Sequence, residues 1–457
     1  MKETTCALIL AAGKGTRMYC ETRPKVMLEL LGEPMLWYVY KALAPVFHTR
    51  LHTVVGFQAE VIGDTFHDHL ERMIIQEQQL GTGHALQVAW DSLKKAGYTH
   101  CLVINGDTPL ISTETIEHML ETAQREEADL AFATITPEGP NAFGRVLRDK
   151  DGNVSAIVEK KDYDPATHGP EPAEVNAGIY LLRMDTIEPL LGWLSNANKS
   201  KEYYITDLVE FAIADKLKVH AVECGNDVSL MGVNNPAELV EAEEVLRARI
   251  IADYQAQGVI IRSPSSVRIG PRANIKPGVE ISGPCEIYGE TCIGSEAKVE
   301  AFTSIFETWI SERSTIHPFS HLDQAVVGHD CSVGPYARLR VGAVMEDEAK
   351  VGNFVEMKKA VLGAGSKASH LTYLGDAEIG AGVNIGAGTI TCNYDGVNKH
   401  RTTIKDGAFI GSNTALVAPV TVGANALVGA GSTITKDVEA NGMAIARGKQ
   451  ISLRRKR

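Results

Sequence analysis

A glycine loop with nearby cations is the first feature of this sequence that could do chemistry. Residues 8–18 read LILAAGKGTRM, and Pro24-Lys25 follow shortly after. Gly13 and Gly15 have no Cβ, so the backbone can turn sharply there and present bare N–H groups to a phosphate chain. Arg17, as a planar fork, and Lys25, as a point charge, could neutralise that polyanion. The pattern indicates a phosphate-binding loop, although a Gly-x-Gly alone fits a structural turn equally well.

The spacing excludes two common phosphate motifs. A dinucleotide-binding G-x-G-x-x-G would need glycine at Met18, and a P-loop would need Gly-Lys-Ser/Thr after a longer loop. The offsets of Arg17, Pro24 and Lys25 from the glycines are therefore more specific than the glycines themselves.

Further polar groups follow apolar runs in the first half of the chain. Asp107 comes directly after the run at 101–105, and a carboxylate there suits Mg²⁺, which usually keeps one or two protein oxygens and substrate phosphates. The alternative for Asp107 is a turn or cap before a helix at Ser112–Thr115. Gln76 and Gly81-Thr82 offer an amide and an unhindered backbone to the edge of a base, or form an ordinary polar loop.

A dense block in the second half could carry a different reaction. It comprises VGNFVEMKK at 351–359, HLTYLGDAEI at 370–379 and NIGAGTITCNYDG at 384–396. His370 lies where a six-residue repeat gives way to Thr372-Tyr373, and imidazole is the natural proton acceptor near neutral pH. A structural role is the alternative, since most of the 14 histidines in the chain are not catalytic.

The elements that must position these groups follow two patterns. Up to about residue 232, apolar runs alternate with amphipathic segments, such as helical patterns at 84–95 and 185–194 beside runs at 101–105 and 177–182. This alternation predicts a doubly wound α/β domain with a mostly parallel sheet. Ligands of such sheets bind beyond the carboxyl ends of the strands. Gly13 and Asp107 both follow strands, so we expect them at the same edge.

The second pattern begins after a helix predicted over 235–257, which Asn235-Pro236 opens and Gly258 ends. From 269 to 305, and again from 404 to 434, an aliphatic residue recurs every six positions. Neither the helical nor the strand period gives this spacing. A parallel β-helix does, because each short strand points one aliphatic side chain into a narrow core. Fibrous or cell-surface repeats are the alternative.

Two breaks in the repeat are candidate functional segments. The register slips around 306–345, and a loop from Cys392 to about Arg401 interrupts it. The predicted domains are thus 1–234, a helical linker at 235–257, and a β-helix domain at 258–457 with a short basic tail.

The length, composition and net charge of the chain limit the classes of protein to which it can belong. A chain of 457 residues is expected to form two or three domains, and 44% hydrophobic with 22% charged residues is typical of a soluble globular protein. A net charge of −12 argues against general nucleic-acid binding, and no apolar stretch approaches the roughly 20 residues that span a bilayer. The N-terminus lacks a signal-peptide layout. The eight scattered cysteines indicate neither zinc nor disulfides, so a cytoplasmic protein is expected.

With Arg17, Pro24 and Lys25 at these offsets, the first half resembles the sugar-1-phosphate nucleotidyltransferases. Over the whole chain the sequence is similar to the bacterial bifunctional GlmU family, since few nucleotidyltransferases join the glycine loop to the block at 370–396. The resemblance implies a left-handed β-helix that acetylates glucosamine-1-phosphate from acetyl-CoA. The α/β domain would then couple N-acetylglucosamine-1-phosphate to UTP, with Mg²⁺, giving UDP-N-acetylglucosamine and pyrophosphate. A cytoplasmic homotrimer acting on small molecules, without nucleic acid or membrane, is implied.

The resemblance also assigns residues in the first half, position by position. Asp107 and Asn234 would hold Mg²⁺, while Arg17 and Lys25 would stabilise charge on the transferring and leaving phosphates. The positions that match UTP and UDP-N-acetylglucosamine contacts are Leu10, Ala11, Ala12, Gly13, Lys25, Gln76, Gly81, Thr82, Asn105, Gly106, Asp107, Gly144, Glu159, Asn176, Tyr204, Thr206 and Asn234.

In the second half, the resemblance makes His370 the general base that takes a proton as the sugar nitrogen attacks the acetyl thioester. Backbone N–H groups near Ala387 would support the developing oxyanion. The positions that would bind glucosamine-1-phosphate are Arg340, Lys358, Tyr373 and Asn384. Those that would line the acetyl-CoA path are Ala387, Asn393, Tyr394, Ser412, Ala430 and Arg447.

Some positions depart from the family pattern, and two other functions fit parts of the sequence. Asn105 replaces an aromatic residue, Val341 replaces a proline, and the tail 454–457 is either a solvated basic end or a contact for CoA phosphates. One alternative function is a single-activity nucleotidyltransferase making ADP-glucose or GDP-mannose, with a structural or regulatory β-helix. The other is a non-catalytic hexapeptide scaffold. The length of the solenoid and the block at 370–396 argue against the first, and sugar-phosphate-dependent release of CoA would exclude the second.

Overall fold

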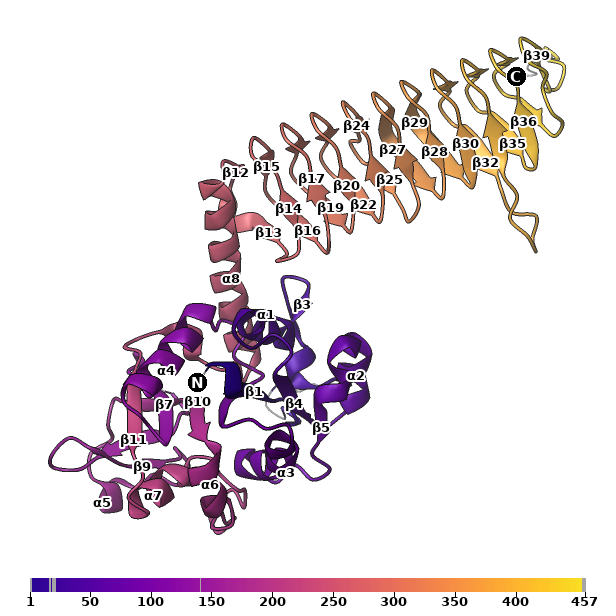
Figure 1. Cartoon of the computed structure of the whole chain (residues 1–457). Coiled ribbons are helices and arrows are strands. Elements are labelled where there is room, and N and C mark those ends of the chain that lie inside the picture. Colours follow the sequence, from indigo (N-terminus) through magenta and orange to yellow (C-terminus); the bar gives the residue numbers. More distant parts are fainter. Residues whose placement is uncertain (1, 16–17, 19–21, 140, 454–457) are drawn as a thin grey trace. The chain divides into compact units, whose positions relative to one another are not determined.

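The computed structural model describes residues 2–15, 18, 22–139 and 141–453, and the chain forms two compact units, Met1–Leu246 and Arg247–Arg457 (Figure 1). Along the sequence, the boundary between the units falls inside helix α8 (Pro236–Ala256), which corresponds to the helix predicted over 235–257. The division into 1–234, 235–257 and 258–457 therefore stays a prediction about functional domains. Arg17 and the tail 454–457 lie outside the described residues, so their expected contacts also stay predictions.

The N-terminal unit is built on a mostly parallel sheet, as the alternation predicts. The strand order is β11-β7-β10-β6-β1-β4-β5. Strand β1 pairs in parallel with both β4 and β6, whereas β10 runs antiparallel to β6 and β7. The antiparallel hairpin β8–β9 joins the sheet at β10. Because the chain order reverses around β1, the carboxyl ends of β1 and β6 flank the switch point where ligands bind in open α/β sheets.

The bounds of these elements follow. The strands are β1 (Thr5–Leu10), β2 (Glu29–Leu30), β3 (Glu33–Pro34), β4 (Leu51–Val55), β5 (Met73–Ile75), β6 (His100–Asn105), β7 (Leu130–Ile135), β8 (Arg145–Arg148), β9 (Val154–Val158), β10 (Val175–Arg183) and β11 (Val219–Glu223). The helices are α1 (Met35–Phe47), α2 (Ala59–Thr65), α3 (Thr82–Lys95), α4 (Thr113–Arg125), α5 (Pro165–His168), α6 (Met184–Leu191) and α7 (Asp207–Ala214), with short 3₁₀ turns at Lys2–Thr4, Lys25–Met27, His67–Arg72 and Val228–Leu230. A further 3₁₀ turn, Pro264–Ser266, belongs to the C-terminal unit.

Helices cover both faces of this sheet, which explains its continuous apolar strands. Successive residues of β1 point to opposite faces: Ala7 and Ile9 pack in one hydrophobic cluster, while Cys6 and Leu8 pack in another. The helix predicted over 185–194 is shorter in the structure, because α6 ends at Leu191 with Gly192 as its cap. Within the described ranges, no helix is both long and apolar enough to cross a bilayer.

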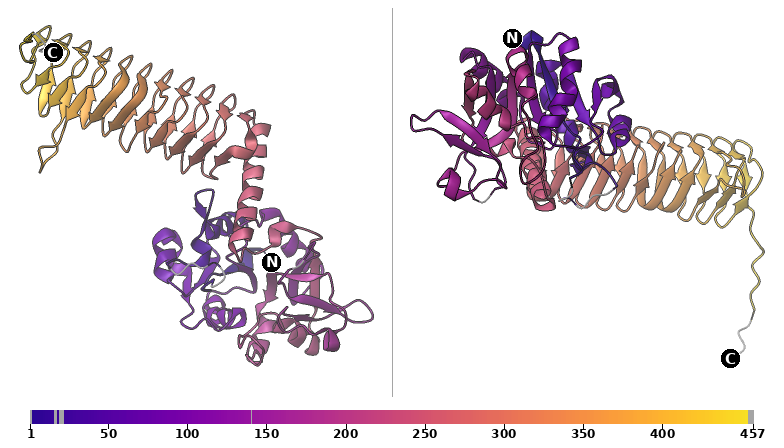
Figure 2. Two further views of the ribbon diagram at one scale, coloured as in Figure 1. Left: turned by 180° about the vertical axis from the view of Figure 1, so that it is seen from behind. Right: turned by 90° about the horizontal axis from the view of Figure 1, so that it is seen from below.

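The C-terminal unit is a parallel β-helix, as the six-residue repeat predicts (Figures 1 and 2). Most of its short strands pair with strands 17 or 18 positions further on: Val267 lies opposite Cys285, and His321 lies opposite Arg338. Pairs that span the loop after Cys392 lie further apart in the sequence, as with Ile390 opposite Ala415. Within the described residues one sheet contains β12 (Ile260–Arg262), β13 (Val267–Ile269), β15 (Glu280–Ser282), β16 (Cys285–Tyr288), β18 (Lys298–Val299), β19 (Thr303–Phe306), β21 (Thr315–Ile316), β22 (His321–Asp323), β24 (Ser332–Val333), β25 (Arg338–Leu339), β27 (Lys350–Lys358), β29 (Lys367–Gly375), β31 (Asn384–Ile385), β32 (Ile390–Cys392), β34 (Phe409–Ile410), β35 (Ala415–Val417), β37 (Leu427–Val428), β38 (Thr433–Ile434) and β39 (Met443–Ala444). The other contains β14 (Asn274–Ile275), β17 (Cys292–Ile293), β20 (Trp309–Ile310), β23 (Val326–Val327), β26 (Val344–Met345), β28 (Val361–Leu362), β30 (Ala377–Ile379), β33 (Thr402–Ile404) and β36 (Val420–Val422).

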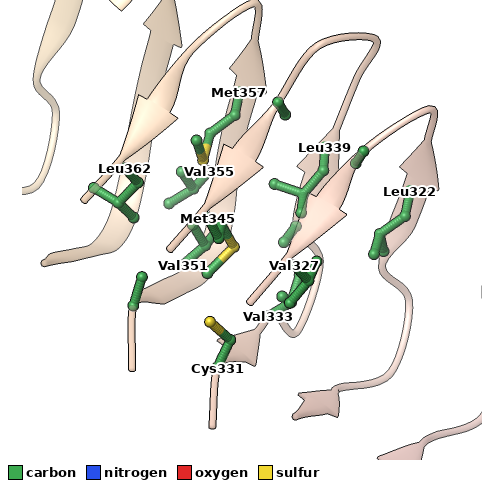
Figure 3. Close-up of a cluster of buried hydrophobic side chains, with 14 of the residues drawn as sticks. Leu322, Val327, Cys331, Val333, Leu339, Met345, Val351, Val355, Met357 and Leu362 are labelled. Atoms are coloured by element: carbon green, nitrogen blue, oxygen red, sulfur yellow. The ribbon is translucent and has the colours of Figure 1, made fainter. Parts of the chain in front are cut away.

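The core of this unit is a column of inward-facing aliphatic side chains, one from each short strand. Figure 3 shows Val327, Val333 and Leu339 pointing inward from successive sides of one coil. Each is fully buried, and burying such a side chain contributes about 1.5–3 kcal/mol to stability. The column is the physical origin of the six-residue repeat.

The register slip predicted at 306–345 is present, but the β-helix continues through it, so the slip is not an interruption of the coil. The buried residues Ile305 and Ile310 are five positions apart, after which the column continues at Ile316. One side of the coil is simply a residue shorter, and Glu307 turns the corner with a left-handed φ of 44°. The predicted interruption after Cys392 is present: β32 ends there and β33 begins at Thr402.

Candidate active sites

A cavity of about 700 Å³ lies at the carboxyl ends of β1 and β6. Its lining includes most positions predicted to contact the nucleotide: Leu10, Ala11, Ala12, Gly13, Lys25, Gln76, Gly81, Thr82, Asn105, Asp107 and Asn234. Gly106 does not line it, because its N–H faces the sheet and donates to Leu10 O at 2.9 Å. The strand-end positions expected to share one edge are therefore together in one cavity.

A second cavity of about 370 Å³ adjoins the first. Gly144, Glu159, Asn176 and Tyr204 line it, and these are the positions expected to contact the sugar and its neighbour. Thr206 lies behind this wall, where its hydroxyl donates to Glu159 Oε1 at 3.2 Å. Five described residues line both cavities, namely Asn105, Asp107, Lys161, Glu202 and Asn234.

The two glycines of the loop differ in the structure. Gly15 has a left-handed φ of +62°, and a Cβ there would lie 2.5 Å from Lys25 Cβ, so glycine at position 15 lets the Lys25 stem pass. Gly13 has no such φ, and a Cβ there would meet nothing within 4 Å, so it leaves open space at the cavity wall. The sharp turn thus depends on Gly15, not on both glycines.

Gln76 is buried, and the contacts of its side-chain amide nitrogen fix the orientation of the amide. Its Nε2 donates to Gly81 O at 3.2 Å and lies 2.9 Å from His84 Nδ1. These contacts occupy the amide nitrogen and leave Oε1 as the group that can accept a proton from a base.

A cluster centred on the Lys25 cation lies in the first cavity, where Lys25 contacts Asp107 and Asn234 of the wall shared with the second cavity. The Lys25 ammonium forms an ion pair with Asp107 Oδ2 and donates to Asn234 Oδ1 at 3.1 Å. Asp107 is not a helix cap, because Ser112 Oγ fills that role for α4 by accepting from Thr115 N at 3.2 Å. Of the two alternatives for Asp107, the cap is therefore wrong, whereas the turn is confirmed, since Gly106 and Asp107 form a turn directly after β6.

The side-chain oxygens of Asp107 and Asn234 are suitable ligands for a divalent metal. Asp107 Oδ1 is buried and, within the described residues, has no hydrogen-bond donor, so a charged oxygen is left for a further cation. Asn234 is held in place by Glu238 Oε2, which accepts from its N–H at 2.6 Å. Among the described residues no group of three or more His, Cys, Asp or Glu side chains gathers as a complete metal site. Two protein oxygens suit a metal whose coordination is completed by substrate phosphates.

Carboxylates line the sugar-side cavity, and burial changes the pKa of Glu159 in its wall and of Asp207 nearby. Burial raises the pKa of Glu159, although the Thr206 hydroxyl opposes this shift by donating to the carboxylate. Burial, together with the Glu210 and Asp162 carboxylates, raises the pKa of Asp207 to about 6.

In the β-helix, His370 is oriented by the coil beneath it. Strands β27 and β29 pair so that Asn353 lies opposite His370, and Asn353 Oδ1 is 2.6 Å from His370 Nδ1. An amide oxygen accepts, so this contact places the ring proton on Nδ1 and leaves Nε2 as a proton acceptor. His370 is exposed in the single chain, which leaves Nε2 open to a substrate.

The positions expected to bind glucosamine-1-phosphate lie on successive coils. Arg340 Nη1 donates to Glu356 Oε1 at 2.7 Å, and Glu356 lies opposite Tyr373 in the next coil. Lys358 closes β27, and Asn384 opens β31 one coil beyond β29. Strand pairing thus collects residues that are far apart in the sequence onto one region of the β-helix surface.

The positions expected to line the acetyl-CoA path form a column up the β-helix. Ala387 O accepts from Asn413 N at 2.7 Å, Ser412 O accepts from Gly431 N at 2.8 Å, and Ala430 O accepts from Arg447 Nη1 at 3.0 Å. Asn393 donates to Asp376 at the base of the interrupting loop, and Tyr394 lies in the loop itself. A column of this kind suits an elongated ligand.

Sequence reasoning missed several residues of these sites. Asn353 and Glu356 could have been found from the coil length, since each lies 17 positions before a predicted site residue. Lys161 and Glu202 had no comparable signal, because they come from polar loops that only the tertiary structure brings to the cavities.

The fold and sites define a two-unit transferase, in which a nucleotide-transferring α/β unit precedes a hexapeptide-repeat β-helix. Residues 7–165 match the MobA-like NTP transferase domain family, residues 269–364 match the GMPPB C-terminal domain, and residues 401–436 match the bacterial transferase hexapeptide (six repeats). These repeats make the C-terminal unit a left-handed β-helix. The GMPPB match ends before His370, so it does not extend over the His370 block.

Whole-chain relatives narrow this class to one family. The chain is 58% identical over 457 residues to Bifunctional protein GlmU of Nitratidesulfovibrio vulgaris (strain DSM 19637 / Miyazaki F), covering 100% of both chains. It is 46% identical to that of Lawsonia intracellularis, covering 98% of this chain and 97% of the relative, and 40% identical to that of Acinetobacter baumannii (strain ACICU), with the same coverage. The chain belongs to the bifunctional GlmU family. It is a transferase of small molecules, with a nucleotide substrate and a divalent metal at its N-terminal unit.

Proposed function

We propose that this chain acetylates glucosamine-1-phosphate from acetyl-CoA and then couples the N-acetylglucosamine-1-phosphate to UTP, releasing pyrophosphate and UDP-N-acetylglucosamine. The observation that supports this best is the pair of adjoining cavities whose shared wall carries Asp107 and Asn234. One cavity has room for a nucleotide and the other for a sugar phosphate. The reacting phosphates would therefore meet beside the two metal-binding oxygens.

In the uridylyltransferase site, the chain's own residues position the two substrates. Gln76 Oε1 and the backbone at Gly81 would receive the uracil edge, and Glu159 and Asn176 would receive the sugar. Lys25 and Arg17 would bind phosphate oxygens and stabilise the charge that develops on the leaving pyrophosphate. Mg²⁺ held by Asp107 and Asn234 would supply further charge neutralisation on the phosphates. The chemistry is positioning and electrostatics, with no side-chain nucleophile.

In the acetyltransferase site, His370 Nε2 would take the proton from the C2 nitrogen of glucosamine-1-phosphate. That nitrogen forms a bond to the thioester carbonyl carbon, and the C–S bond breaks as CoA leaves. Arg340 and Lys358 would bind the sugar phosphate, and backbone N–H groups near Ala387 would stabilise the oxyanion. Asn353 keeps the His370 ring in the tautomer that this step needs.

The proposal includes a homotrimer in the cytoplasm. The match of residues 401–436 to the bacterial transferase hexapeptide family supports an oligomer, and the exposed His370 leaves room for a neighbouring subunit. UTP and acetyl-CoA are cytoplasmic substrates, and the described cysteines are free thiols that suit a reducing compartment.

Two variants of the full chain separate the two activities. Asp107→Ala should abolish metal-dependent pyrophosphate release and leave acetylation intact, while His370→Ala should do the reverse. A mixture of the two variants should form UDP-N-acetylglucosamine from glucosamine-1-phosphate, because N-acetylglucosamine-1-phosphate can pass between molecules. Loss of both activities in either variant would contradict the assignment of one reaction to each unit.

A further inference from the structure

Lys161 is a cation at the boundary between the two N-terminal cavities. Of the five described residues that line both cavities, two are acidic (Asp107 and Glu202), two are amides (Asn105 and Asn234), and Lys161 carries the positive charge. The family resemblance gave no role to Lys161. Its position coincides with the place where a sugar phosphate in the smaller cavity would approach the nucleotide.

The charges of the smaller cavity make this lysine conspicuous. Four carboxylates line the cavity, those of Asp107, Glu159, Glu202 and Glu238, and a phosphate dianion would be repelled by them. The described cations in the same wall are Lys160 and Lys161. A sugar phosphate can bind there only if a cation offsets this field.

Lys160 is not available for that task, whereas Lys161 is. The Lys160 ammonium is tied in an ion pair with Glu171, which also pairs with Arg145. For the Lys161 ammonium, the described residues provide no hydrogen-bond or ion-pair partner. Its main chain is nevertheless fixed, because Lys161 O accepts from Lys199 Nζ at 2.8 Å and the preceding turn is closed by Asp162 N donating to Glu159 O at 2.9 Å.

We infer that the Lys161 ammonium binds the phosphate of the sugar 1-phosphate and is a further catalytic residue of uridylyl transfer. The inference rests on the proposed function of this site. In the step, an oxygen of the sugar phosphate forms a bond to the α-phosphorus of UTP, and the bond from that phosphorus to the bridging oxygen of pyrophosphate breaks. Lys161 holds the attacking phosphate against the surrounding carboxylates, and Lys25 lies on the nucleotide side.

The test compares Lys161→Met with Lys160→Met, a neighbouring lysine whose charge is already paired. Pyrophosphate release is measured with the full-length chain at saturating Mg²⁺, varying N-acetylglucosamine-1-phosphate and UTP in turn. Loss of a charge-assisted phosphate contact typically costs about 1.5–3 kcal/mol, so kcat/KM for the sugar phosphate should fall by about 10- to 150-fold in Lys161→Met. The KM for UTP should change by less than about threefold, and Lys160→Met should stay within about threefold of wild type. Lys161→Arg should recover part of the loss.

Each other outcome has a definite meaning. Unchanged kinetics in Lys161→Met, or a loss confined to the KM for UTP, would overturn the assignment of Lys161 to the sugar phosphate. Equal losses in both methionine variants would also overturn it, because they would reflect the general charge of the loop. Circular dichroism and the KM for UTP of the same samples report folding of the N-terminal unit, in which both lysines lie. If wild type itself releases no pyrophosphate, the proposed function fails, and that result is distinct from a failure of Lys161 alone.

Discussion

The ammonium of Lys25 lies against the carboxylate of Asp107 and the amide oxygen of Asn234, the two oxygens proposed to hold a divalent metal. The Lys25 ammonium thus lies between the two residues proposed as metal ligands. Lys25 and Asp107 are both largely buried, with side-chain exposures of 13% and 19%, so this pairing is shielded from solvent. Asp107 Oδ1 is open to a metal, but Asn234 Oδ1 already accepts from Lys25, so a metal that binds both residues competes with the Lys25 ammonium. Displaced from Asn234, Lys25 becomes free to contact a phosphate.

Removing Lys25 should therefore strengthen metal binding while weakening catalysis. In Lys25→Met, two oxygens lose their competing cation, and relieving a like-charge contact of about 1 kcal/mol would lower the Kd for a divalent ion about fivefold. Binding of Mn²⁺ to the protein without nucleotide, followed by the electron paramagnetic resonance of free Mn²⁺, measures this directly. Uridylyl transfer by the same variant should fall at least about a hundredfold.

Lys14→Met is the matched control for this experiment. Lys14 lines the same cavity, but its ammonium lies over the Phe57 ring at 6.0 Å from the centroid and not between the two oxygens. Its removal should leave Mn²⁺ affinity within about twofold of wild type. Weaker Mn²⁺ binding in Lys25→Met than in wild type would refute the displacement.

Asn353 should act on acetyl transfer through His370. Asn353→Ala removes the acceptor at 2.6 Å from Nδ1, so the ring can adopt the wrong tautomer, and kcat should fall by about 10- to 100-fold with little change in the KM for either substrate. Asn353→Asp keeps an acceptor and should restore much of the rate while shifting the pH profile to higher pH, because a carboxylate stabilises the imidazolium. A KM effect without a kcat effect would mean that Asn353 binds substrate and does not orient the base.

The inward column should dominate the stability of the β-helix. Ile316 is fully buried in this column, and Ile316→Ala should lower the free energy of unfolding by about 2–5 kcal/mol because it leaves a cavity. The adjacent Thr315→Ala removes an outward side chain and should change it by about 0.5 kcal/mol or less. Denaturant unfolding at one fixed protein concentration compares the two variants. Similar losses in both would contradict the packing described.

The raised pKa of Asp207 makes stability depend on pH in a predictable direction. Asp207 titrates near pH 6 in the folded chain, against about 3.9 in an unfolded one. The folded state therefore binds the extra proton between these values, so Asp207 lowers stability as pH rises from about 4 to about 6, and the loss persists above that. The melting temperature of Asp207→Asn should rise relative to wild type over this range and then stay level. A calorimetric difference that is constant from pH 4 to pH 8 would show that Asp207 does not titrate as described.

Much of the fold could be predicted because the type of a single residue indicates whether its side chain is buried. The repeat from Ile269 to Ile305 predicts the β-helix, since each inward strand needs one aliphatic residue. The spacing of five between Ile305 and Ile310 departs from the six-residue repeat, but it only shortens one corner of the coil, which the sequence alone does not reveal. The antiparallel direction of β10 had no sequence signal, since a buried strand has the same apolar pattern in either direction.

The candidate sites were predictable only in part, for a related reason. Gly13 and Asp107 directly follow strands of one sheet, so their shared edge follows from topology. The contact of Asn353 with His370 depends on coil length, and the arrival of Lys161 at the cavity depends on how two loops pack. Neither property is encoded in a local motif. Asn105, the residue that departs from the family pattern, lines both cavities and so stays within the site.

A single chain of this family performs two successive transfers. The most direct test is mass analysis of the sugar products formed by the pure protein with glucosamine-1-phosphate, acetyl-CoA, UTP and Mg²⁺. We expect UDP-N-acetylglucosamine together with pyrophosphate and free CoA. Accumulation of N-acetylglucosamine-1-phosphate without any nucleotide sugar would contradict the function of the N-terminal unit, and the absence of any acetylated sugar would contradict that of the β-helix.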